Sequence, residues 1–474
     1  MNVPLNELIA ALPREDTSGE RVFAREEMER IFEDLAMRPA PTGSLQRLWN
    51  MSELSVQVAL AYSLSRIRGW FADAAGEEQR KLETNLRIAL KIVHRLSYMR
   101  GALMKAGQAA ACFPGILPSE ILSTLEDLHF DAPPMHYTLI REVLINELGS
   151  EPEDLFQNFE RQAFAAASIG QVHRATLKSG ERVAVKIQYP GIARTIDADI
   201  RNLVALMLPL RLGRNWDGLR AALEEVHRVL KLEADYRLEA KSLGKARALF
   251  QDSDGIVIPR VYERYSGERV LTMEYLQGQH LPDYLATLPA QESRNEFGTK
   301  MCSSWYRMFI AGLSYCDPHA GNYLFMDDGR LGLLDFGCVL DNPAQAERLS
   351  VYHSVYESDQ STPDLCRAFI ELGLNPDDLQ DERYRAVVDE SVRWTREPFE
   401  KNGPFDYGDP QYLRRRALWL SSAAGHGHAL ADDASLVYFT TATLKMAALL
   451  YQLRAQVNMK SLPMDQWWSE RSCQ

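Results

Sequence analysis

Two short stretches in the second half of the chain decide its interpretation, Cys316-Asp-Pro-His-Ala-Gly-Asn322 and Leu333-Leu-Asp-Phe-Gly337. Asp317 and Asn322 are five positions apart, and Asp335 follows 18 residues after Asp317. Phosphoryl transfer from a nucleotide uses magnesium, which prefers hard oxygen ligands on short, rigid loops. A carboxylate and an amide at this spacing, followed by a second carboxylate before a glycine, supply such a set.

Two further motifs precede these stretches in the order that is typical of kinases. Lys186 lies in Val-Ala-Val-Lys-Ile at the end of a strand-like segment, where a cation could neutralise the α- and β-phosphates of a nucleotide. Upstream, Ala165-Ala-Ala-Ser-Ile-Gly-Gln-Val172 occupies the place of a glycine-rich phosphate loop. Each motif alone is also explained by a buried lysine stem or an alanine-rich turn, but their common order and spacing favour a kinase-like site. The candidate nucleotide-binding residues are Ala165, Ala166, Ala167, Ser168, Gly170, Val172, Lys186 and Glu274.

Residues from about Leu96 to Gln360 resemble the UbiB-type atypical kinases, the AarF/ADCK group. Four features that separate this group from ordinary protein kinases carry the resemblance. They are the K-x-G-Q motif Lys105-Ala-Gly107-Gln108, the alanine-rich loop Ala165–Gly170, the E-x-D motif Glu233-Ala-Asp235 with the later Glu239, and the catalytic loop Asp317–Asn322. Ala320 replaces the usual proline of that loop, a departure that leaves both candidate ligands in place.

The resemblance implies a role for each matching residue. Lys186 would pair with Glu239 to set the nucleotide-binding lysine. Asn322 and Asp335 would hold magnesium, and Asp317 would orient or deprotonate the phosphoryl acceptor. Lys105 would lie over the active site and meet Glu233 and Asp235. We expect Glu233, Asp235 and Glu239 to lie within two turns of one helix, where three carboxylates need a counter-cation or they repel. A solvated helix face and a surface lysine are the alternatives for these charges taken singly.

For function, the resemblance implies binding of ATP or ADP with magnesium, and ATP hydrolysis linked to isoprenoid-quinone (ubiquinone-type) lipid metabolism. Protein phosphorylation is disfavoured, because no long loop ending in Ala-Pro-Glu follows Gly337. One alternative is a nucleotide-switched lipid-handling or assembly factor without phosphotransfer. Another is a small-molecule phosphotransferase of the aminoglycoside/choline kinase type, which has no need of the K-x-G-Q and E-x-D motifs. The expected partners are a nucleotide and a lipid or quinone-like molecule.

The change of periodicity along the chain predicts an α+β, two-lobed protein-kinase-like fold with a mostly helical C-lobe. Strands are expected at 181–188, 257–262 and 269–275, a long helical stretch at about 192–250, and helix from Leu281 onward apart from a strand-like patch at 324–334. The expected domains are a flexible arm at 1–43, a helical extension with the K-x-G-Q motif at 44–148, an N-lobe at 149–277 and a C-lobe at 278–474.

The composition excludes several classes of protein. The net charge of −12 argues against a general nucleic-acid binder, which needs a basic face. Six cysteines without a CxxC pair argue against a disulfide scaffold or a structural zinc site. We find no signal peptide and no apolar run of about 20 residues, so we expect a cytoplasmic protein. The amphipathic segment Val56–Phe71 favours packing on the protein body, with a peripheral membrane anchor as the alternative.

Overall fold

The computed structural model describes residues 135–167, 169–193, 230–341, 380–412 and 434–472, with scattered positions between 196 and 228 and at 370, 376 and 415. The expected arm at 1–43 and the Val56–Phe71 helix lie outside these residues. So do Ser168 and the K-x-G-Q residues Lys105, Gly107 and Gln108.

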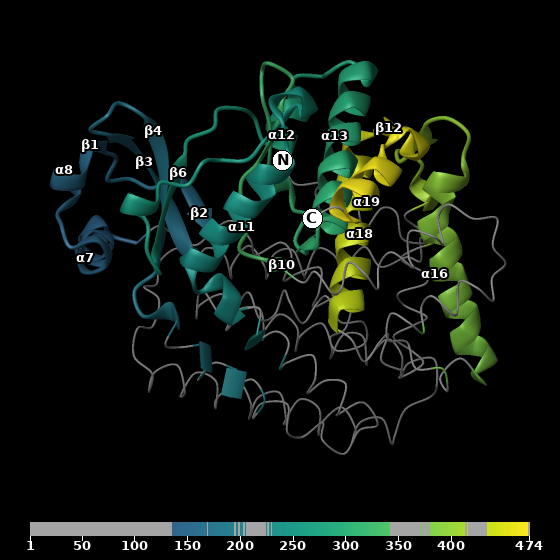
Figure 1. Ribbon diagram of the computed structural model, residues 1–474, viewed down its shortest axis with the longest axis horizontal. Helices are drawn as coiled ribbons and strands as arrows, with labels where there is room; N and C mark the ends of the chain where they lie inside the picture. The colour runs from purple at the N-terminus through teal and green to yellow at the C-terminus, as the bar shows by residue number, and fades with distance from the viewer. Residues whose placement is uncertain are drawn as a thin grey trace, which may run out of the picture. The chain divides into compact units, whose positions relative to one another are not determined.

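A five-stranded sheet follows the order β1-β3-β4-β6, with β2 paired to β3 (Figure 1). Its strands are β1 (Phe156–Phe159), β2 (Ala165–Ala167), β3 (Gly170–Leu177), β4 (Arg182–Gln188) and β6 (Val270–Glu274). The turn between β3 and β4 contains Gly180 at φ 99°, and the Gly180 N–H donates to the Leu177 carbonyl at 2.9 Å. Glycine suits this left-handed backbone. The predicted strands at 181–188 and 269–275 are thus confirmed.

Strand β4 differs from the alternating pattern in one respect. The alternation of polar and apolar residues predicts one solvent-facing side, yet all six residues from Val183 to Gln188 are buried. Strand β4 is a central strand whose two edges pair with β3 and β6, and the burial of consecutive residues shows that both of its faces are covered as well. Lys186 and Gln188 are therefore polar side chains inside the protein.

The expected continuous helix over about 192–250 is interrupted at Ala234–Asp235, and α11 (Tyr236–Leu249) starts anew after it. Asp235 has an extended backbone, φ −118° and ψ 98°, and its carboxylate accepts a hydrogen bond from the Arg237 N–H at 3.0 Å. Aspartate is a preferred N-cap because it satisfies such free N–H groups. The expectation that Glu233, Asp235 and Glu239 lie on one helix was therefore wrong.

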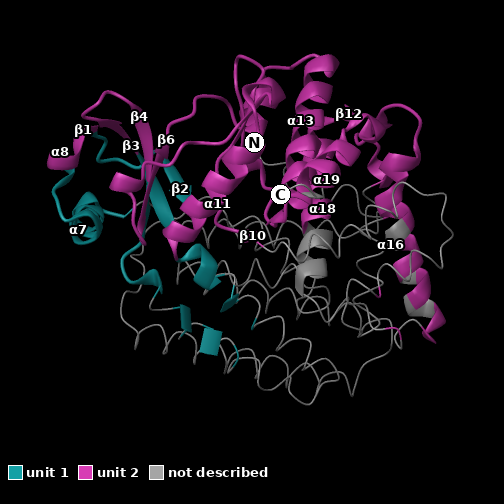
Figure 2. Cartoon of the chain, in the orientation of Figure 1, with its two compact units in different colours: residues 1–152, 159–173, 186–234 teal, residues 153–158, 174–185, 235–474 magenta. Residues whose placement is uncertain are grey.

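The chain divides into two compact units (Figure 2). Unit 1 comprises residues 1–152, 159–173 and 186–234, and unit 2 comprises residues 153–158, 174–185 and 235–474. Strands β1, β3 and β4 of the five-stranded sheet each contribute residues to both units. The described part of unit 1 contains α7 (Tyr137–Leu148), whose buried face is formed by Ile140, Val143 and Leu144. The short helix α8 (Pro152–Leu155) follows α7.

Unit 2 contains more strands than the sequence predicts. The strand-like patch at 324–334 is a hairpin of β8 (Tyr323–Phe325) and β9 (Leu331–Leu333), to which β5 (Ile256–Val257) adds in parallel. The expected strand at 257–262 thus shrinks to β5 and a single bridge between Val261 and Met273. The region after Leu281 also has two more strand pairs, which the helical pattern missed. These pairs are β7 (Leu313–Tyr315) with β10 (Val339–Asp341), and β11 (Phe405–Asp406) with β12 (Gln456–Val457).

The core of unit 2 is built around α13 (Gln291–Ile310), which packs against α18 (Ala434–Leu453) and α19 (Met464–Ser472) (Figure 1). Met308 and Phe309 are buried in α13, which lies in the region from Leu281 onward that the sequence predicts to be helical. Other helical segments of the unit are η2 (Asp252–Asp254), η3 (Glu263–Tyr265), α12 (Leu281–Ala286), η4 (Ala320–Asn322), α16 (Glu382–Glu400) and η6 (Met459–Ser461). Within the described residues, no helix is both long and apolar enough to cross a membrane.

Candidate functional site

Two strand pairs of unit 2 bring together the three residues that the sequence singles out most strongly. In the first pair, β7 and β10 are antiparallel, and just beyond them the Cys316 N–H donates to the Cys338 carbonyl at 3.1 Å. In the second pair, the β8–β9 ladder continues through the Leu334 N–H, which donates to the Asn322 carbonyl at 3.0 Å. Asp317 follows β7, Asn322 precedes β8, and Asp335 lies between β9 and β10.

A capped turn holds the catalytic loop in shape. The residues Ala320–Asn322 form the short helix η4, and the preceding His319 is its N-cap. His319 Nδ1 accepts a hydrogen bond from the Gly321 N–H at 3.1 Å, and the His319 carbonyl accepts one from the Asn322 N–H at 2.9 Å. A side chain at position 321 would place its Cβ 3.3 Å from His319 Nδ1, so the imidazole would have to shift by a few tenths of an ångström. Alanine at position 320 is compatible with this turn.

Asn322 and Asp335 have the chemistry of magnesium ligands. The Asn322 Nδ2 donates to the Asp317 carbonyl at 3.0 Å, so the amide group is oriented and its other terminal atom is an oxygen. Asp335 Oδ1 accepts from the Gly337 N–H at 2.9 Å, which orients that carboxylate in turn. In the described part of the chain, no three His, Cys, Asp or Glu side chains gather as a metal centre by themselves. Magnesium that arrives with a nucleotide needs only one or two protein ligands, because phosphates supply the rest.

A buried tyrosine, which the sequence did not point to, lies beside the two carboxylates. The Tyr315 carbonyl accepts from Trp305 Nε1 at 3.1 Å, and the Phe336 ring packs edge-on against the Tyr315 ring at 5.5 Å. Burial raises the pKa of Tyr315 well above its usual value, and the nearby Tyr323, Asp335 and Asp317 raise it further. The phenol therefore stays protonated at neutral pH, next to groups that carry negative charge.

Glu239 connects α11 to the segment that carries Asp335. Its side chain is buried, and Oε1 accepts a hydrogen bond of 3.4 Å from the Phe336 N–H. The sequence assigns Glu239 as the partner of Lys186, which lies on β4 and belongs to unit 1. Lys186 is only 6% exposed, and a buried ammonium group needs a counter-charge. The Lys186–Glu239 pair stays a prediction.

Lys445 is the second site residue that the motif analysis missed. It lies on α18, and its Nζ is 2.7 Å from Asp317 Oδ1. The side chains are 35% exposed for Lys445 and 21% for Asp317, so the pair is partly withdrawn from solvent. One signal in the sequence could have drawn attention to it, because Lys445 is the single charged residue between Ala434 and Leu453.

The alanine-rich segment of unit 1 forms an antiparallel hairpin rather than an irregular loop. Ala165 pairs with Val172, and Ala167 pairs with Gly170. Ala165 and Ala166 are exposed, whereas Gly170 is buried and Val172 is half-buried. The hairpin end is held in place because the Ile169 carbonyl accepts from the Tyr189 N–H at 3.0 Å.

The candidate acidic residues elsewhere have different surroundings. In unit 1, Glu233 is buried, and the carbonyl of the next residue, Ala234, accepts a hydrogen bond from Gln188 Nε2 at 2.7 Å. Glu274, at the end of β6, uses Oε2 to accept from the Arg260 N–H at 3.2 Å. The guanidinium of Arg247 is 3.9 Å from the same oxygen, so the Glu274 side chain belongs to a polar cluster within unit 2.

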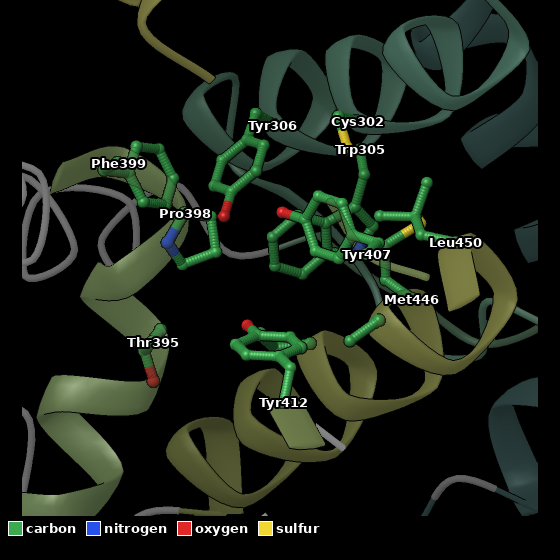
Figure 3. Close-up of a pocket in the computed structure, with 12 residues that line it drawn as sticks. Cys302, Trp305, Tyr306, Thr395, Pro398, Phe399, Tyr407, Tyr412, Met446 and Leu450 are labelled. Atoms are coloured by element: carbon green, nitrogen blue, oxygen red, sulfur yellow. The ribbon is translucent and has the colours of Figure 1, made fainter. Parts of the chain in front are cut away.

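A small cavity lies on the other side of α18. It is lined by Tyr306 of α13, by Met446 and Leu450 of α18, and by Tyr407 and Tyr412 (Figure 3). Its volume of about 20 Å³ holds about one water molecule and is far too small for a nucleotide. Burial raises the pKa of Cys302, which also lines the cavity, to about 12, so this thiol is a packing group.

Comparison with known proteins shows the family to which the chain is related. The ABC1 atypical kinase-like domain family matches residues 127–362. The mitochondrial atypical kinase COQ8B of Danio rerio is 31% identical over 374 residues, which are 75% of this chain and 58% of that protein. The mitochondrial atypical kinase COQ8 of Saccharomyces cerevisiae is 31% identical over 330 residues, which are 67% of this chain and 64% of that protein. The chain thus spans about three fifths of the length of these relatives.

A solved structure extends the likeness to the fold. The complex of Rv3197 with erythromycin from Mycobacterium tuberculosis superposes with a TM-score of 0.54 and 26% sequence identity, covering 82% of this chain and 97% of that one. Asp317, Asn322 and Asp335 all lie within the matched residues 127–362. Residues 127–362 are therefore an ABC1 atypical kinase-like domain, and the chain belongs to the UbiB family of atypical kinases.

Proposed function

We propose that this protein binds ATP or ADP together with magnesium and hydrolyses or transfers the terminal phosphoryl group. The observation that carries the proposal is the convergence of Asp317, Asn322 and Asp335 at the ends of two strand pairs, where hydrogen bonds orient the Asn322 amide and the Asp335 carboxylate. This is the set of oxygen ligands and acid groups that phosphoryl transfer requires.

Each residue has a role that its surroundings support. Asn322 and Asp335 would hold magnesium, which neutralises phosphate charge when bound. Asp317 would orient the acceptor hydroxyl and take its proton. Lys186 would contact the nucleotide phosphates with Glu239 as its counter-charge, and the Ala165–Gly170 hairpin would cover them. Its alanine Cβ atoms would make this cover stiffer than one built from glycine.

The regulatory part of the proposal concerns the K-x-G-Q residues Lys105, Gly107 and Gln108. In the resemblance, this motif lies over the active site and meets Glu233 and Asp235. These two acidic residues flank the helix break before α11, so a cation that bridges them would contact a turn rather than one helix face.

The physiological role that we propose is support of isoprenoid-quinone or related lipid metabolism rather than phosphorylation of proteins. Membership of the UbiB family supports it. So does the sequence after the Asp-Phe-Gly motif, in which no long segment ending in Ala-Pro-Glu follows Gly337. A protein kinase uses a long loop at this point to dock its peptide substrate.

The test is phosphate release by the purified protein with magnesium and ATP, in the presence of phospholipid vesicles and a phenolic quinone-like compound. We expect turnover that these additives stimulate and that Asp335→Asn abolishes. Asp341→Asn is the matched control, because Asp341 pairs with Lys245 on the surface and lies outside the cluster. Tight nucleotide binding without turnover under any condition would favour the alternative, a nucleotide-switched lipid-handling or assembly factor. If neither ATP nor ADP binds, both the proposed enzyme and the nucleotide-switched factor are refuted.

A further inference from the structure

We propose that Lys445 is the positioning residue of Asp317, supplied to the catalytic loop by the C-terminal helix α18; this inference rests on the proposed function. The distance of 2.7 Å between Lys445 Nζ and Asp317 Oδ1 is that of a charge-assisted hydrogen bond. Such a bond restricts rotation of the carboxylate. Asp317 and Lys445 are 128 residues apart in sequence, so the contact depends on how α18 packs.

The packing of α18 fixes where Lys445 lies. Ala442, Met446, Leu449 and Leu450 are buried, and this apolar surface packs α18 against the core of unit 2. Met446 and Leu450 line the small cavity (Figure 3). Lys445 is the only charged residue in the helix sequence, and a lone cation in an apolar helix is unfavourable unless a partner compensates it. The helix therefore presents a single cation, and its structural partner is the aspartate of the catalytic loop.

The chemistry of the proposed reaction explains why the orientation of the Asp317 carboxylate matters. Asn322 Nδ2 donates to the backbone carbonyl of Asp317, whereas the hydrogen bond from Lys445 acts on the carboxylate itself. The acceptor hydroxyl passes its proton to this carboxylate as its oxygen bonds to the γ-phosphorus. The bond from the γ-phosphorus to the leaving oxygen breaks, and its electron pair leaves on ADP. Misplacement of a reacting group by about 1 Å can cost about 100-fold in rate.

The experiment compares Lys445→Met with the wild-type protein. Methionine keeps the length of the side chain and suits an apolar helix, but it removes the charge. We expect kcat for phosphate release to fall about 100-fold, while the Kd for ATP, measured by calorimetry, changes less than about twofold because Lys445 acts through Asp317. Lys445→Arg keeps the cation and should recover much of the rate. Lys460→Met is the matched control, because Lys460 contacts the Glu400 carbonyl and Asn402 instead.

A double variant separates a positioning role from other roles. If Lys445 acts through Asp317, its replacement has no further effect once Asp317 is replaced. The double variant Asp317→Asn/Lys445→Met should then have the same kcat as the single variant Asp317→Asn. Additive losses, or a wild-type kcat in Lys445→Met, would overturn the inference. A parallel loss of ATP affinity and thermal stability in both Lys445→Met and Lys445→Arg would make the pair a structural anchor of α18, which also overturns it. Absence of turnover in the wild-type protein would instead refute the proposed function.

Discussion

The buried carboxylate of Glu239, on α11, accepts a hydrogen bond from the backbone N–H of Phe336, 97 residues later in the chain. Phe336 follows Asp335 directly, and its ring packs against Tyr315, which precedes the catalytic loop. Glu239 therefore acts on the backbone beside a candidate magnesium ligand, in addition to its predicted role as the partner of Lys186. The helix that starts at the Asp235 cap thus contacts the segment that carries Asp335 directly.

Replacement of Glu239 tests this contact. Glu239→Ala removes the acceptor and leaves the Phe336 N–H unsatisfied inside the protein, which should lower the free energy of local opening by about 1–3 kcal/mol. Glu239→Gln keeps an oxygen acceptor and should lower it less. Hydrogen exchange measured by mass spectrometry on peptides that contain Phe336 reports this difference. Equal protection of Phe336 in the wild-type protein and in Glu239→Ala would show that the contact contributes nothing.

The cap of the catalytic turn gives a second prediction. His319→Ala removes the Nδ1 acceptor of the Gly321 N–H, so Asn322 loses part of the framework that orients it. We expect ATP turnover to fall about 10- to 100-fold, the range typical when a group that orients a metal ligand is lost. His319→Asn offers a side-chain oxygen at a similar position and should retain most of the turnover. The rates of phosphate release of the two variants should therefore differ; identical rates would exclude the capping role.

Stability should depend on pH through a buried histidine in unit 1. His173 lies on β3, where its ring contacts the Gln171 side chain and the Glu160 carbonyl. Burial lowers the pKa of His173 below its usual value of 6.5. The unfolded chain thus binds a proton at a higher pH than the folded protein does. The contribution of neutral, buried His173 to the free energy of unfolding is complete above about pH 6.5. It is lost as the pH falls below that value.

This pH dependence can be measured by thermal unfolding between pH 7.5 and 5.5. His173→Gln should unfold with a weaker dependence on pH over this range than the wild-type protein. A wild-type slope in His173→Gln would mean that other groups cause the effect.

The sequence predicted the local features of the fold well. The β-branched residues of 181–188 and the turn at Gly180 correctly indicated β4, because both signals act within a few residues. Helix α13 was predicted for the same reason, as part of the region from Leu281 onward that was expected to be helical. The loops that carry Asp317, Asn322 and Asp335 were found from their spacing, and the strand pairs of unit 2 account for that spacing.

The features that were missed depend on contacts between distant residues. Strands of three residues, such as β7, have too little local pattern to be told from helix, and they exist because a partner 24 or more residues away completes their hydrogen bonds. The helix break at Asp235 was hidden among good helix formers. Lys445 could not be assigned to Asp317, because no motif spacing relates two residues that meet only through the packing of α18.

The central claim is that Asn322 and Asp335 hold magnesium with a nucleotide, and the most direct measurement is the Kd for ATP with and without magnesium. We predict that magnesium strengthens ATP binding to the wild-type protein by about tenfold or more, which is about 1.4 kcal/mol. In Asp335→Asn this gain should vanish, whereas Asp341→Asn should retain it. An equal gain from magnesium in Asp335→Asn and the wild-type protein, or no ATP binding by the wild-type protein, would contradict the account.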